Sequence, residues 1–105
     1  MPEKTYAGVS VQVNDEGFFL DHTAWKKEMA AEIAKEEGIE DFGDGHWKVI
    51  EFLQKYHAEN GSMPTIRRVN KLGGIPTKEL YSLFPGGPLK KSSKVAGLPK
   101  PASCV

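Results

Sequence analysis

The segment from Asp44 to Asn60 constrains the fold more than any other part of the chain. Its apolar residues recur at helical spacing in two adjoining stripes. The stripes are Trp47, Ile50 and Leu53, with Val49, Phe52 and Tyr56 beside them. Gly61 follows as a helix stop. We therefore expect a long helix with a wide apolar face, and we expect it to form the centre of the hydrophobic core.

The residues before this segment predict a small β-hairpin and one more helix. Val9–Val13 alternates apolar and polar residues, residues 14–17 (Asn-Asp-Glu-Gly) suit a turn, and residues 18–20 follow as a second apolar run. A helix is expected over residues 24–37, because large apolar side chains recur there at every fourth position and Gly38 ends the pattern.

Two short helices are predicted after the central segment, over residues 65–72 and 77–84, joined by a Gly-Gly-Ile-Pro turn. This arrangement is typical of a helix-turn-helix-like element. The fold class is therefore mostly α, a helical bundle with a small N-terminal β-hairpin. We expect residues 1–84 to form the globular domain and residues 85–105, which are rich in proline and glycine, to form a flexible C-terminal arm.

Charge divides along the chain although the formal net charge is zero. Residues 1–64 contain thirteen acids and six bases, whereas residues 65–105 contain eight bases and one acid, Glu79. No run of about 18 apolar residues is present that would suit a membrane span, and the N-terminus lacks the pattern of a secretory signal. We expect a cytoplasmic protein that docks to partners through charge.

The only cysteine is Cys104, the next-to-last residue. A lone cysteine excludes an intramolecular disulfide, and the three histidines lack the spacing that would make a zinc site with it. Lysines of the arm can favour the thiolate form when they come near, while the terminal carboxylate of Val105 acts in the opposite direction. A cysteine near the chain end of a lysine-rich arm indicates a reactive thiol.

The helix-turn-helix-like element is also compatible with a different class of function, the binding of DNA. Its bases, Arg67, Arg68, Lys71 and Lys78, could neutralise phosphates, which makes a DNA-binding regulator an alternative. The second helix of the element contains no Asn, Gln or Arg to contact base edges, so this signal is weak.

Two runs near the C-terminus are distinctive, Leu80–Pro88 (LYSLFPGGP) and Lys94–Val105 (KVAGLPKPASCV). They resemble the signature of the DsrC/TusE family of sulfur-relay proteins, and the runs His46–Leu53 and Pro64–Arg67 fall at corresponding positions. The resemblance thus covers nearly the whole chain. The resemblance implies a small, mostly helical domain in which Cys104 carries sulfur as a persulfide at the tip of the arm.

Ser93 departs from one branch of this family. DsrC proteins of dissimilatory sulfur metabolism carry a second cysteine at this position, and serine cannot close a disulfide or trisulfide. The resemblance therefore implies one-cysteine chemistry similar to that of TusE, in a relay of the tRNA 2-thiouridine type or of sulfur metabolism. The alternative is a DsrC-type partner of dissimilatory sulfite reductase, or of a heterodisulfide-reductase-like complex, whose second cysteine has been replaced by Ser93.

The resemblance implies a sulfurtransferase that acts as a co-substrate protein between a protein sulfur donor and a protein sulfur acceptor. We expect it to need no metal and no organic cofactor. Arg67, Lys94 and Lys100 are expected to stabilise the persulfide anion or to dock partners. His46, at the start of the central helix, is expected to cap or pack rather than to act as a general base.

Overall fold

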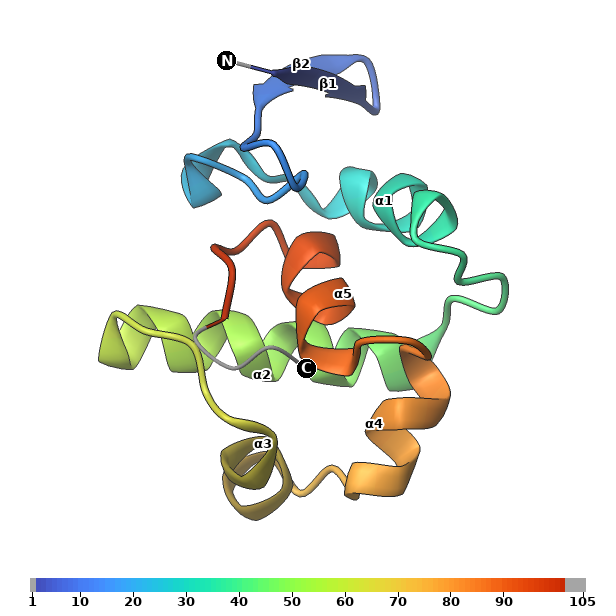
Figure 1. Cartoon of the computed structure of the whole chain (residues 1–105), viewed down its shortest axis with the longest axis vertical. Coiled ribbons are helices and arrows are strands. Elements are labelled where there is room, and N and C mark those ends of the chain that lie inside the picture. Colours follow the sequence, from blue (N-terminus) through green and yellow to red (C-terminus); the bar gives the residue numbers. More distant parts are fainter. Residues whose placement is uncertain (1, 102–105) are drawn as a thin grey trace.

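The computed structural model describes residues 2–101, which form a two-stranded hairpin and five α-helices (Figure 1). The strands are β1 (Glu3–Tyr6) and β2 (Val9–Gln12), and two 3₁₀ helices follow, η1 (His22–Ala24) and η2 (Lys27–Met29). The α-helices are α1 (Ala30–Glu36), α2 (Asp44–Asn60), α3 (Ile66–Gly73), α4 (Thr77–Leu83) and α5 (Pro88–Val95). The predicted mostly helical fold with a small N-terminal hairpin is confirmed.

The central helix α2 crosses the middle of the molecule, with α1 and α5 on one side and α3 and α4 on the other (Figure 1). Its predicted start and end are confirmed. The backbone N–H of Gly43 donates to Nδ1 of His46 at 3.1 Å, and Gly61 ends the helix with a φ of 70°, a conformation that glycine adopts without steric cost. The buried side chains that face the core include Val49, Ile50 and Leu53.

The hairpin uses a different partner strand from the one predicted. β2 pairs antiparallel with β1, with Tyr6 opposite Val9. The predicted turn does form, since Oδ1 of Asn14 accepts hydrogen bonds from the backbone N–H of Glu16 and of Phe18. Beyond that turn, however, only one bridge forms among the described residues, between Val13 and Phe19. In a regular strand successive side chains point to opposite faces. In the run 18–20 two consecutive phenylalanine rings are both buried, so this run does not continue as a strand.

The first α-helix starts later than predicted. Trp25 and Lys26 have extended backbones, and the regular helix begins only at Ala30, after a 3₁₀ turn. The extended backbone places the Trp25 indole against α5, where its N–H donates to the carbonyl oxygen of Val95 at 2.9 Å. The predicted spacing therefore marked side chains that pack in the core, with Met29 and Ile33 buried and Trp25 partly buried, although tertiary contacts override helix formation over 24–29.

The helix-turn-helix-like element is confirmed. Thr65 caps α3, with its side-chain oxygen accepting from the backbone N–H of Arg68 at 3.2 Å. Gly74 ends α3 with a φ of 64°, and α4 begins directly after Pro76. Val69 and Leu80 are buried and fix the two helices to the core.

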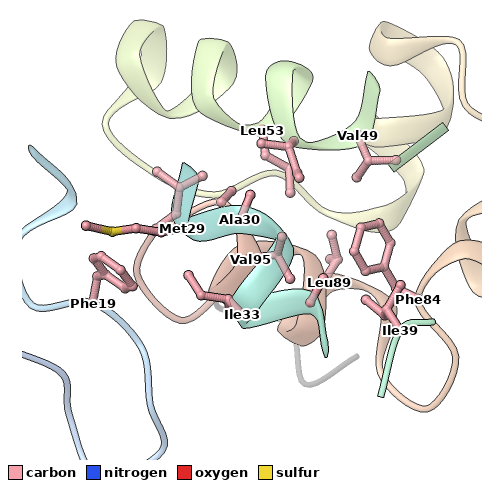
Figure 2. Packing of buried hydrophobic residues seen from close by; sticks show 14 of the residues in the cluster. Phe19, Met29, Ala30, Ile33, Ile39, Val49, Leu53, Phe84, Leu89 and Val95 are labelled. Carbon is pink, nitrogen blue, oxygen red and sulfur yellow. The ribbon is translucent and has the colours of Figure 1, made fainter. Parts of the chain in front are cut away.

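The largest difference from the sequence-based expectation lies after Phe84, where the sequence predicted a flexible arm. The structure instead has α5, with Pro88 in its first turn, a position at which proline suits a helix. Leu89 and Val95 are fully buried and belong to one cluster with side chains of α1 and α2 (Figure 2). Burial of each such side chain contributes about 1.5–3 kcal/mol. The boundary predicted at residue 84 therefore does not separate the core from α5.

The core cluster extends from the hairpin to Leu98, which lies three positions after the end of α5. Figure 2 shows side chains from separate segments of the chain, among them Phe19, Met29, Ile33 and Phe84, gathered in this cluster. Among residues 2–101, no helix is long and apolar enough to cross a membrane.

Candidate functional site

The candidate site is the sharp corner formed by Val95–Leu98, from which the chain leads toward Cys104. Gly97 has a φ of 69°, its N–H donates to the carbonyl oxygen of Lys94 at 3.0 Å, and the N–H of Leu98 donates to that of Ser93 at 2.9 Å. These bonds end α5 and reverse the chain direction. A Cβ atom on residue 97 would lie 2.4 Å from ring atoms of Trp25, so only glycine fits this corner without movement.

Two side chains from distant segments hold the corner in place. Trp25 donates to the carbonyl oxygen of Val95, and Nε2 of Gln54, on α2, donates to that of Ala96 at 3.0 Å. These carbonyls lie at the helix end, where no intrahelical partner remains. The corner is therefore fastened to α2 and to the segment between η1 and η2. No sequence pattern marked Trp25 or Gln54 for this role; the one available signal was the indole N–H, which needs an acceptor when it is buried.

The chain continues from the corner through Pro99 and Lys100 to Pro101, which is buried. Cys104, the predicted sulfur carrier, lies outside the described residues. In the described residues 2–101, no three His, Cys, Asp or Glu side chains form a group that could hold a metal ion.

The structure separates the three basic residues of the predicted site. Nζ of Lys94 lies 3.5 Å from Oε1 of Glu37 and 5.2 Å from the centroid of the Phe18 ring. Nζ of Lys100 lies 2.9 Å from Oε1 of Glu16. Both therefore contact the acidic N-terminal half, whereas Arg67 lies on α3, on the other side of α2 (Figure 1).

The ion pair between Lys100 and Glu16 predicts a dependence on pH. The hydrogen bond from Lys100 holds the pKa of the Glu16 carboxyl below its usual value. A depressed folded-state pKa means that the pair's contribution is present above the unfolded-state pKa and is lost as pH falls through the folded-state pKa. Carboxyl NMR should give a lower pKa for Glu16 in the native chain than in Lys100→Met. Equal values would show that the pair does not persist in solution, where salt screens exposed charges.

Ser93, at the second-cysteine position, is fully buried in α5. Its Oγ finds no hydrogen-bond partner among the described residues. The neighbouring Ser92 is equally buried, but its Oγ donates to the carbonyl oxygen of Pro88 at 2.6 Å. A buried hydroxyl without a partner is unfavourable, so the surroundings of residue 93 suit a less polar side chain such as a thiol better than a hydroxyl.

The two adjacent serines give a matched test of this difference. Ser93→Ala is expected to leave the free energy of unfolding unchanged or to raise it by about 1 kcal/mol, because it removes an unpartnered polar atom. Ser92→Ala is expected to lower it by about 1 kcal/mol through loss of a hydrogen bond. Urea unfolding of both variants measures this. A larger loss for Ser93→Ala than for Ser92→Ala would contradict the geometry.

His46 is confirmed as a structural residue. Its Nδ1 accepts from Gly43, so its Nε2 carries the proton and donates to the carbonyl oxygen of Leu83 at 2.9 Å. The neutral ring thus joins the start of α2 to the end of α4. His57 lies apart from it, with its ring edge-on to His22 at a centroid distance of 5.1 Å. Burial, together with the neighbouring His22, lowers the pKa of His57.

Comparison with known proteins decides the family. The model of the family described as DsrC-like protein matches residues 5–105. The chain belongs to the DsrC-like family. Among DsrC-like relatives, the dissimilatory-type sulfite reductase gamma subunit of Nitratidesulfovibrio vulgaris is 45% identical over 105 residues, which is 100% of both chains. Sulfurtransferase TusE of Escherichia coli is 35% identical over 107 residues, covering 95% of this chain and 97% of TusE.

Solved structures of DsrC-like proteins share the fold. A chain in the crystal structure of dissimilatory sulfite reductase I (DsrI) matches with a TM-score of 0.89 and 39% identity, covering 99% of this chain and 100% of that one. The NMR structure of Allochromatium vinosum DsrC matches with a TM-score of 0.80 and 35% identity, covering 98% and 97%. The predicted membership of a sulfur-relay family is confirmed, and these relatives lend the DNA-binding alternative no support.

Proposed function

We propose that this chain is a sulfur carrier that accepts sulfane sulfur as a persulfide on Cys104 and passes it to a partner protein. The observation that carries the proposal is that the chain has a single cysteine, at the penultimate position, and matches a named sulfurtransferase over nearly its full length. A reducing, cytoplasmic compartment would keep that thiol free between transfers.

The proposed reaction is an exchange between thiols. The Cys104 thiolate attacks the outer sulfur of a donor persulfide, so a new S–S bond forms on Cys104 while the donor's S–S bond breaks and the donor leaves as a thiolate. The outer sulfur is then transferred in the same way to an acceptor. In each step one S–S bond forms and one breaks, so no external oxidant or reductant is needed. The exchange requires neither a metal nor an organic cofactor.

The fixed corner limits how far the thiol can reach. Leu98 is buried, and Cys104 follows only six positions later. Six residues extend at most about 20 Å, much less than an arm starting at Pro85 could span. A partner must therefore come close to the body of this domain to receive sulfur.

The basic residues take different parts in the proposal. Lys100 lies four positions before Cys104 and would favour a persulfide anion there through its charge. Arg67 has an exposed side chain on α3 and serves to dock partners. Lys94 forms an ion pair with Glu37, and through this pair it positions the end of α5 that leads into the corner.

The first candidate for a partner is a protein of a tRNA-thiolation relay, as for TusE. A dissimilatory-type sulfite reductase is the second. This candidate is favoured by the 45% identity to a gamma subunit of such an enzyme and by the TM-score of 0.89 with a chain of DsrI. With Ser93 in place of a second cysteine, the chain would act there through Cys104 alone.

Transfer of radioactive sulfur tests the proposal and separates the two candidates. The chain, loaded with ³⁵S on Cys104, is mixed with a purified dissimilatory sulfite reductase or with the protein components of a tRNA-thiolation relay. Transfer of the label from the chain to one of these proteins identifies the acceptor class. Failure of the chain to take up any label would refute the carrier function itself.

A further inference from the structure

A basic surface with an apolar centre lies on the exposed side of α3, away from the corner that leads to Cys104. One hollow of about 370 Å³ is lined by Thr65, Arg67, Arg68, Lys71 and Leu72. An adjoining hollow of about 270 Å³ is bordered by the same Arg68 and Leu72 and by α2 side chains that include Phe52 and Tyr56. We call these two hollows together the α3 surface.

Leu72 is the apolar centre of the α3 surface. It is 65% exposed, more than Val9, Leu20 or Tyr81, the other large apolar side chains exposed in residues 2–101. Leu72 borders both hollows, next to the rings of Phe52 and Tyr56. An exposed apolar side chain in a hollow rimmed by charges is typical of a protein contact site.

The basic residues around Leu72, namely Arg67, Arg68 and Lys71, are exposed. Arg68 is held in place because its Nη1 donates to the hydroxyl oxygen of Tyr56 at 3.0 Å. Arg67 and Lys71 make no ion pair with any residue of the described range 2–101. α3 contains no acid, and Glu59 is the one acidic side chain in the lining of the two hollows. The α3 surface therefore presents net positive charge to a partner.

We propose that the α3 surface binds an acidic segment of a protein partner, with an aliphatic or aromatic side chain of that segment packed on Leu72 and its carboxylates on Arg67, Arg68 and Lys71. This inference rests on the proposed function in one respect, namely that the partner exchanges sulfur with Cys104. A partner that receives the thiol must also contact the domain, because Cys104 lies only six positions after the buried Leu98.

A protein segment suits this surface better than a nucleic acid does. Phosphate groups would satisfy the arginines but would leave Leu72 without an apolar partner. Asn70, the one amide side chain of α3, donates to the carbonyl oxygen of Ile75 at 3.1 Å and is not free to contact a base. Carboxylates pair with arginine in fixed geometry, and an adjacent leucine would cover the exposed apolar atoms.

The experiment uses a synthetic acidic peptide in which leucines are spaced among glutamates, titrated into the ¹⁵N-labelled full-length chain. We expect backbone NMR shifts confined to α3 and the last turns of α2. Arg67→Glu combined with Lys71→Glu should weaken binding about tenfold or more, because like charges then face each other. Leu72→Ser should weaken it about fivefold through the lost apolar contact.

Matched controls isolate the role of the α3 surface. Lys35→Glu reverses an exposed charge on α1, on the far side of α2 (Figure 1), and should leave peptide affinity within about twofold. A peptide with serine in place of leucine, and a DNA duplex of equal charge, should both bind more weakly than the leucine peptide. Absence of peptide binding, shifts located away from α3, or tighter binding of the duplex would each overturn the proposal.

Sulfur loading from a small donor separates this proposal from the carrier function. Glutathione persulfide needs no docking surface, so Leu72→Ser should load Cys104 as fully as the native chain. In the native chain, sulfur loading without peptide binding would overturn the docking proposal alone. Loading that fails in the native chain would overturn the carrier function and leave the peptide result to stand by itself.

Discussion

Gly97→Ala is expected to destabilise the chain by about 3 kcal/mol. Residue 97 has a φ of 69°, and a side chain in this left-handed region costs about 1–2 kcal/mol. The added Cβ would also lie 2.4 Å from the ring of Trp25, and overpacking of this kind costs about 1–3 kcal/mol. Movement of the indole would weaken its bond to Val95. Urea unfolding measures the loss.

Gly61→Ala is the matched control. Gly61 ends α2 with a φ of 70°, yet no heavy atom lies within 4 Å of a Cβ built there. This substitution should therefore cost only the conformational part, about 1–2 kcal/mol. Equal losses for the two variants would show that contact with Trp25 does not fix the corner, and that the reach of the terminal residues is not limited in the way we describe.

Cys104→Ser is expected to abolish sulfur delivery completely. Serine offers no thiolate and cannot form an S–S bond, so neither uptake nor transfer remains. Ser93→Ala, which changes the second-cysteine position instead, should leave delivery at the native level. Delivery of ³⁵S to whichever acceptor the transfer experiment identifies measures both variants. Residual delivery by Cys104→Ser would mean that sulfur travels without this residue.

The sequence predicted most helices because their signals are local. The two apolar stripes of α2 and the glycine at residue 61 define that helix within its own span. α5 was missed because Pro88 was treated as a helix breaker, whereas at the first helical position proline favours a start. β1 was missed because residues 3–5 are polar and largely exposed, so they lack apolar alternation.

The candidate site was predictable only in part. Membership of the sulfur-relay family followed from the residues near the C-terminus and is confirmed by the match over 5–105. The roles of Trp25 and Gln54 were not predictable, because these residues lie 70 and 42 positions before the carbonyls that they bind. Contacts of this kind arise from packing of distant segments, which periodicity along a single segment does not encode. The sulfur-carrying role of Cys104 stays a prediction.

Intact-mass spectrometry after incubation with a persulfide donor tests the central claim most directly. The native chain and Cys104→Ser are treated side by side, and each mass is compared before and after reduction. We predict that the native chain gains the mass of one sulfur atom, that reduction removes it, and that Cys104→Ser gains none. No gain by the native chain, or an equal gain by both, would contradict the assignment of Cys104 as the sulfur carrier.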